Sequence, residues 1–138
     1  MRNLFTYGSL MFLPVWSRLV SQTYSSSPAM LKGYARYLVR DESFPGIVPA
    51  GSDQALEGVL YHQVSAEDIR HLDSFEGDLY ERLTVEVVLP DQTLVVADTY
   101  VIRSDKQDCL SHMSWKAEEF RRRDLQQFID DYTGFSGD

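Results

Sequence analysis

The sequence has very little cysteine: Cys109 is the only one in 138 residues. An intrachain disulfide is therefore excluded, and this cysteine usage fits a reducing compartment, so we expect a cytoplasmic protein. Cys109 also lacks the flanking pattern of a catalytic nucleophile. We interpret it as a small, partly buried thiol.

Long apolar runs are missing as well. None reaches the roughly 18–20 residues that a membrane-spanning helix needs. The N-terminus does not have the form of a signal peptide, because Arg2 is followed at once by a short strand-like run that ends at residues 7–9. The sequence therefore predicts no membrane partner.

Positive charge is scarce. The chain has 13 Lys and Arg against 21 Asp and Glu, a formal net charge of −8. Such a surface repels phosphate backbones, so we expect no nucleic-acid partner. The one basic cluster, Arg121 to Arg123, lies among acidic residues, and we interpret it as a solvated helix face.

Motifs for metal and nucleophilic chemistry are also lacking. His62, His71 and His112 are far apart and show no paired metal-ligand spacing, so no metal site is predicted. No Gly-x-Ser-x-Gly sequence is present. Ser9 could act as a nucleophile only if a histidine and an acid converged on it.

The organisation of the chain predicts a single domain over residues 1–138, with a C-terminal helix at about 115–132 and a frayed tail at 133–138. A hydrophobic fraction of 43% can fill the core of such a domain. The patterns indicate strands at 3–6, 30–39, 55–63, 82–89 and 94–102, helices at 14–19 and 66–76, and an irregular segment at 44–49. Because helices and strands do not alternate regularly, we expect an α+β fold: a small, mixed, curved, barrel-like sheet of about five to seven strands with flanking helices.

Several local signals sharpen these boundaries. Ser65 and Asp68 have the spacing of a capping box at the start of the second helix, and Gly77 is placed to end it. Gly58 lies inside a strand pattern, which indicates a bulge or a close backbone approach. Ser114 is placed to cap the C-terminal helix.

Glu76 is the first candidate for chemistry. It falls on the last turn of an amphipathic helix, directly after Phe75. The negative end of the helix dipole and burial beside Phe75 would both raise its pKa toward the range useful for proton transfer. By position alone, an exposed glutamate at a helix end is the favoured interpretation.

The turn Tyr7-Gly8-Ser9-Leu10 is the second candidate. A strand that ends just before a helix leaves backbone N–H groups unpaired, and such a turn can bind a carboxylate or phosphate. It is neither a P-loop nor a dinucleotide fingerprint, and an ordinary strand-to-helix turn is the alternative. Asp73 lies three residues before Glu76, so a carboxylate pair for glycoside hydrolysis is a further possibility.

Several short pieces follow one another in a specific order and spacing over roughly Met1 to Arg103. These are Phe5-Thr6-Tyr7-Gly8-Ser9-Leu10, Leu31-Lys32-Gly33-Tyr34, Phe44-Pro45-Gly46-Ile47-Val48-Pro49, Leu56-Glu57-Gly58-Val59-Leu60-Tyr61, Leu72-Asp73-Ser74-Phe75-Glu76-Gly77-Asp78-Leu79-Tyr80-Glu81-Arg82 and Ala97-Asp98-Thr99-Tyr100-Val101. With these pieces the chain resembles the γ-glutamyl cyclotransferase-like superfamily, which includes the AIG2-like and γ-glutamylamine cyclotransferase proteins.

The resemblance implies a small mixed β-barrel and an enzyme that cyclises a γ-glutamyl group to 5-oxoproline, releasing an amine or amino acid. The family's pattern would make Glu76 the catalytic acid/base. The backbone amides of the turn at Tyr7, Gly8, Ser9 and Leu10 would hold the α-carboxylate of a small γ-glutamyl substrate. Tyr80 and Tyr100 would line or support the pocket. The resemblance implies no cofactor or metal.

Some parts of this expectation stay open. The oxyanion donor could be a tyrosine hydroxyl or a backbone amide, and Arg82 could be a structural partner of a carboxylate. We expect residues 12–28 and 104–115 to shape the leaving-group side of the pocket. A non-catalytic binding or interaction domain on the same fold is the alternative function, and the sequence contains no signal for the oligomeric state.

Overall fold

The computed structural model describes residues 1–133, and its centre is a closed five-stranded barrel. The barrel strands follow the order β1-β5-β2-β6-β7, while β3 and β4 form a separate two-stranded sheet beside it. The strands are β1 (Arg2–Thr6), β2 (Ser26–Lys32), β3 (Tyr34–Leu38), β4 (Pro45–Pro49), β5 (Ala55–Val64), β6 (Tyr80–Val88) and β7 (Leu94–Ile102). This architecture confirms the predicted α+β fold with a small barrel.

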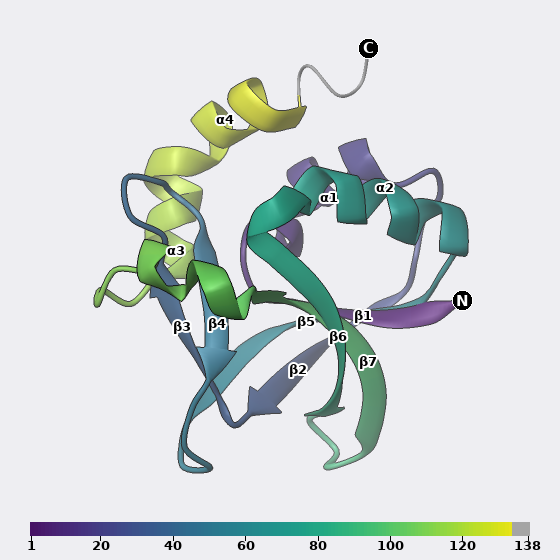
Figure 1. Cartoon of the computed structure of the whole chain (residues 1–138). Helices are drawn as coiled ribbons and strands as arrows, with labels where there is room; N and C mark the ends of the chain where they lie inside the picture. The colour runs from purple at the N-terminus through teal and green to yellow at the C-terminus, as the bar shows by residue number, and fades with distance from the viewer. Residues whose placement is uncertain (134–138) are drawn as a thin grey trace.

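The helical segments flank the barrel. They are α1 (Leu13–Leu19), α2 (Ala66–Glu76) and the short 3₁₀ turns η1 (Ser9–Met11), η2 (Gly77–Leu79) and η3 (Ser104–Cys109), followed by the C-terminal segments α3 (Ala117–Glu119), η4 (Phe120–Asp124), α4 (Leu125–Phe128) and η5 (Ile129–Thr133). Figure 1 shows α1 and α2 together over one end of the barrel, and the C-terminal segments rising beside β3 and β4. Among residues 1–133, no helix is both long and apolar enough to cross a membrane.

The strand predicted at 30–39 is wrong as a single element. Gly33 has φ of 83°, which turns the chain out of the extended direction. As a result β2 ends at Lys32 in the barrel, and β3 begins at Tyr34 in the other sheet.

The segment predicted to be irregular at 44–49 is also different in the structure. It contains β4, which pairs antiparallel with β3 over five residues, from Tyr34 opposite Pro49 to Leu38 opposite Pro45. The two prolines stand at the ends of the strand, so their missing N–H groups do not interrupt the middle of the ladder.

Gly58 confirms the predicted close backbone approach. A Cβ atom at this position would lie 2.1 Å from the carbonyl oxygen of Thr6 and 2.7 Å from the Phe5 ring. Only a glycine lets β5 approach the end of its antiparallel neighbour β1 this closely.

The start of α2 forms only half of the predicted capping box. The Ser65 hydroxyl accepts a hydrogen bond from the Asp68 N–H at 3.2 Å. The Asp68 carboxylate does not return to Ser65. It accepts instead from the Ser21 N–H and, at 2.6 Å, from the Tyr24 hydroxyl. Asp68 therefore ties α2 to the segment after α1, and Gly77, with φ of 75°, ends the helix as predicted.

The strands predicted at 82–89 and 94–102 are confirmed as β6 and β7, which pair antiparallel in one continuous register from Tyr80 opposite Ile102 to Val88 opposite Leu94. The C-terminal helix differs from the prediction. It begins at Ala117 without a side-chain cap from Ser114. The π-helical segment η4 interrupts it, and a second π-helical segment, η5, follows α4. The wider π turns change which side chains share a face, and Phe120, Phe128 and Ile129 are buried. The Tyr132 side chain and the predicted tail from 134 onward lie outside the described residues.

Candidate active site

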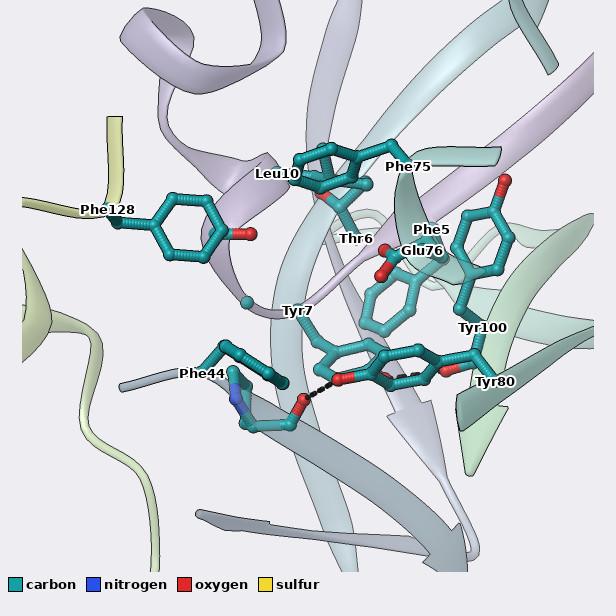
Figure 2. A pocket seen from close by; sticks show the side chains of 13 residues that line it. Phe5, Thr6, Tyr7, Leu10, Phe44, Phe75, Glu76, Tyr80, Tyr100 and Phe128 are labelled. Carbon is teal, nitrogen blue, oxygen red and sulfur yellow. Dashed lines mark hydrogen bonds between the residues drawn. The ribbon is translucent and has the colours of Figure 1, made fainter. Parts of the chain in front are cut away.

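A cavity of about 110 Å³ lies between the end of β1, the end of α2 and the C-terminal helical segments. All of the site residues predicted from the sequence are in its wall: Tyr7, Gly8, Ser9, Leu10, Glu76, Tyr80 and Tyr100. They come from four places in the chain: β1 with η1, the last residue of α2, the first residue of β6, and β7. The barrel brings them together (Figure 2).

Glu76 presents its carboxyl group to this cavity, above the Tyr7 and Tyr80 rings (Figure 2). Within the described part of the chain the carboxyl accepts no hydrogen bond, and its oxygens are not sealed from the cavity. Burial raises the pKa of Glu76 to about 8, and the nearby charge of Asp73 adds to the rise. The group can therefore exchange a proton close to neutral pH.

The turn after β1 offers a row of free backbone donors. The N–H groups of Gly8, Ser9 and Leu10 have no acceptor among residues 1–133, and neither does the Ser9 hydroxyl. The next two amides, of Met11 and Phe12, bond back to the carbonyls of Gly8 and Ser9 and hold the turn in shape. Consecutive unpaired N–H groups in a cavity wall suit an anionic ligand.

The three tyrosine hydroxyls of the site already donate to protein acceptors. Tyr7 donates to the carbonyl of Tyr100 at 2.6 Å, Tyr80 to the carbonyl of Pro45 at 2.7 Å, and Tyr100 to the Asp73 carboxylate at 2.7 Å. Burial raises the pKa of Tyr7 and of Tyr80 well above the ordinary value, so both stay protonated. In this arrangement the tyrosines support the cavity, and the donors left for a ligand are the turn amides and Ser9.

Asp73 is engaged away from the cavity. It accepts from Arg82 Nε at 2.9 Å and from the Tyr100 hydroxyl, and it is not part of the cavity wall. Arg82 also pairs with Asp98, which makes it a structural ion-pair residue, as expected. A glycoside hydrolase needs two carboxyl groups in one cleft, and the described structure offers only Glu76 there.

The aromatic part of the wall was missed by the sequence analysis. Phe44, Phe75 and Phe128 line the cavity, with the Phe128 ring 6.3 Å from Phe44 and 6.2 Å from Phe75 in edge-to-face pairs. Residues 12–28 and 104–115, expected to shape this side, contribute no lining residue. The C-terminal helix predicted at about 115–132 includes Phe128, but the sequence did not indicate that this residue reaches a ligand site.

Other chemistries find no support among residues 1–133. No three His, Cys, Asp or Glu side chains gather there as metal ligands. No histidine of this part lines the cavity, so Ser9 has no imidazole base beside it.

The comparisons with known proteins agree with this geometry. Residues 4–117 match the protein family described as "Gamma-glutamyl cyclotransferase, AIG2-like". Protein AIG2 C of Arabidopsis thaliana is 34% identical over 131 residues, which are 94% of this chain and 78% of that protein.

Two solved structures show the same fold. A solution structure of an Arabidopsis thaliana protein superposes with a TM-score of 0.73 at 32% identity, covering 98% of this chain and 81% of the other. A yeast γ-glutamyl cyclotransferase specific to glutathione superposes with a TM-score of 0.67 at 14% identity, covering 94% and 87%. This last likeness concerns the fold alone. Taken with the barrel and its cavity, the matches show that the chain belongs to the γ-glutamyl cyclotransferase, AIG2-like family.

Proposed function

We propose that this protein cyclises the γ-glutamyl group of a small substrate to 5-oxoproline and releases an amine or an amino acid. The observation that carries the proposal is the meeting of two complementary groups in one small cavity. The Glu76 carboxyl has no hydrogen-bond partner in the described chain, and the amides of Gly8 to Leu10 have no acceptor there. One group can move a proton and the other can hold an anion.

The turn would fix the substrate through its α-carboxylate. A γ-glutamyl group carries this carboxylate on the carbon that also bears the attacking amine. Anchoring the α-carboxylate holds the substrate's γ-glutamyl group folded, so that its amine meets its γ-carbonyl carbon. Holding the two reacting atoms in contact replaces a search in solution and supplies a large part of the rate.

Glu76 would then act first as a base and afterwards as an acid, with the same proton. As the α-amine nitrogen bonds to the γ-carbonyl carbon, the Glu76 carboxylate accepts a proton from that nitrogen. When the tetrahedral intermediate collapses, the bond from the γ-carbon to the leaving nitrogen breaks, and Glu76 returns the proton to it. A carboxyl whose pKa is raised to about 8 by burial is suited to both steps.

The oxyanion of the intermediate needs a donor as well. Because the hydroxyls of Tyr7, Tyr80 and Tyr100 are already engaged, we assign this role to the Ser9 hydroxyl or to a turn amide that the carboxylate leaves free.

The test is a panel of γ-glutamyl amines and γ-glutamyl amino acids, with 5-oxoproline release measured by chromatography. We expect turnover of at least one compound. Glu76→Gln should lower the rate by about two orders of magnitude or more, the scale of a missing proton-transfer group. The matched control is Glu67→Gln, an exposed glutamate at the other end of α2, which should leave the rate unchanged. A normal rate in Glu76→Gln would rule out the mechanism.

The alternative is a binding domain without catalysis. It predicts that the purified protein binds 5-oxoproline or a γ-glutamyl compound but turns over no member of the panel. Glu76→Gln should still bind in both cases, because the turn amides remain. Loss of binding in that variant would make Glu76 a ligand contact instead of a proton carrier.

A further inference from the structure

Arg36 of β3 lies behind the anion-binding turn, outside the wall of the cavity. Its Nη1 donates to the carbonyl oxygen of Tyr7 at 2.7 Å and to that of Glu57 at 3.2 Å. The guanidinium also sits over the ring of Trp115, 5.2 Å from its centre, where a cation is attracted to the aromatic face. Backbone and aromatic contacts therefore fix a half-buried arginine against the first residue of the turn.

This arginine has no carboxylate close enough to form an ion pair within residues 1–133. Arg82, by contrast, pairs with both Asp73 and Asp98. Burial lowers the pKa of Arg36, but a guanidinium stays charged in proteins. The charge of Glu57 acts on Arg36 from beyond ion-pair distance, and the half-buried guanidinium lies one peptide group away from a site suited to an anion.

The hydrogen bond from Arg36 acts on the first peptide group of the turn. The carbonyl of Tyr7 and the N–H of Gly8 belong to the same peptide group. A charged donor on the carbonyl polarises that group and strengthens hydrogen bonds given by its N–H. The Gly8 N–H is one of the turn amides without an acceptor in the described chain.

We propose that Arg36 is a positioning residue that tunes the turn for a carboxylate, through its hydrogen bond to the Tyr7–Gly8 peptide and through its positive charge. It does not touch the ligand. The inference rests on the carboxylate-binding role given to the turn under the proposed function, and it does not require turnover.

The experiment compares two ligands that differ only in the carboxylate. 5-Oxoproline carries it and 2-pyrrolidinone lacks it. Each is titrated into the full chain, and the amide signals of Gly8, Ser9 and Leu10 are followed by ¹H–¹⁵N NMR. The variants are Arg36→Lys, which keeps a charged donor, and Arg36→Gln, which keeps a neutral one. Arg70→Gln, an exposed arginine on α2, is the control for net charge.

We expect Arg36→Gln to weaken 5-oxoproline binding about tenfold, the scale of one charge-assisted hydrogen bond, and to leave the binding of 2-pyrrolidinone unchanged. Arg36→Lys and Arg70→Gln should stay within about threefold of the unsubstituted protein. The Gly8 amide proton of the free protein should move upfield in Arg36→Gln and in neither of the other variants. Unshifted amides in β6 and β7 show that a variant has kept its fold.

Three results would overturn the inference: an equal loss in Arg36→Lys and Arg36→Gln, an equal loss for both ligands, or no response of the turn amides to 5-oxoproline in the unsubstituted protein. If Arg36→Gln does not fold, Arg36→Lys decides. A loss of 5-oxoproline affinity beyond threefold in Arg36→Lys overturns the inference. Retained affinity in Arg36→Lys, with no upfield shift of the Gly8 amide proton, supports it. Failure of the proposed function has a different signature, in which binding depends on the charge at 36 but no γ-glutamyl compound is turned over.

Discussion

At the scale of single residues, Glu76 differs from the other acids of α2 because of what surrounds its carboxyl. Asp68 is also buried, but its carboxylate accepts hydrogen bonds from the Ser21 N–H, the Ser21 hydroxyl and the Tyr24 hydroxyl, and these lower its pKa against the effect of burial. Glu76 has no such donors in the described chain. Burial without hydrogen bonds therefore leaves it with a raised pKa and a proton to transfer.

This difference predicts a pH-dependent stability. The folded pKa of Glu76 is about 8 and its ordinary value is 4.5, so the folded state binds the extra proton between these values. The free energy of unfolding should therefore fall as pH rises from about 5 to 8 on account of this group. Glu76→Gln removes this effect. The free energy of unfolding of the variant minus that of the unsubstituted protein should therefore be larger at pH 8.5 than at pH 5.

Urea denaturation at the two pH values measures this gain, and Glu67→Gln serves as the exposed control. The prediction is wrong if the stability difference between Glu76→Gln and the unsubstituted protein is the same at both pH values.

At the scale of elements, the cavity depends on the C-terminal helical segments, although the match to the family ends at residue 117, where these segments begin. Phe128 of α4 is buried, contacts the rings of Phe44, Phe75 and Phe120, and lines the cavity. These segments therefore close one side of the site instead of only covering the barrel.

Phe128→Ala should lower the free energy of unfolding by about 3–5 kcal/mol, because a buried phenylalanine is replaced by a void. Arg123→Ala, on the exposed face of η4, should change it by less than about 0.5 kcal/mol. Thermal or urea denaturation of both variants makes the comparison. A loss below about 1 kcal/mol in Phe128→Ala would mean that α4 does not pack over the cavity in solution.

At the scale of the whole molecule, one hydrophobic cluster joins the barrel to its helices. Trp16 of α1 stacks on Tyr61 of β5 with ring centres 3.7 Å apart. Trp115 packs on Phe120 at the other side, and all four residues belong to the same buried cluster. Elements that share one core are expected to unfold together.

The two tryptophans can test this cooperativity. In Trp16→Phe the fluorescence reports on Trp115, and in Trp115→Phe it reports on Trp16. In each variant the fluorescence transition in urea should coincide with the loss of far-UV circular dichroism. An earlier fluorescence transition for Trp115 alone would show that the C-terminal segments unfold separately.

The sequence by itself determined the features that depend on neighbours along the chain. The spacing of Ile69, Leu72 and Phe75 with Gly77 behind them defined α2, and the alternation in 82–102 defined the β6–β7 hairpin. Short ordered motifs also pointed to the family and to every residue predicted for the site. These signals are readable because helix periods, caps and turns act over a few residues.

Only the tertiary structure decided what the site can do. The sequence patterns place Gly33 inside one strand and Pro45 in an irregular segment, because which sheet each strand joins depends on distant pairing. The raised pKa of Glu76, the engaged tyrosine hydroxyls, Phe128 in the cavity wall and Arg36 behind the turn all depend on contacts between residues far apart in the chain. Burial and electrostatics are properties of the assembled surroundings, and closing the barrel is the step that creates them here.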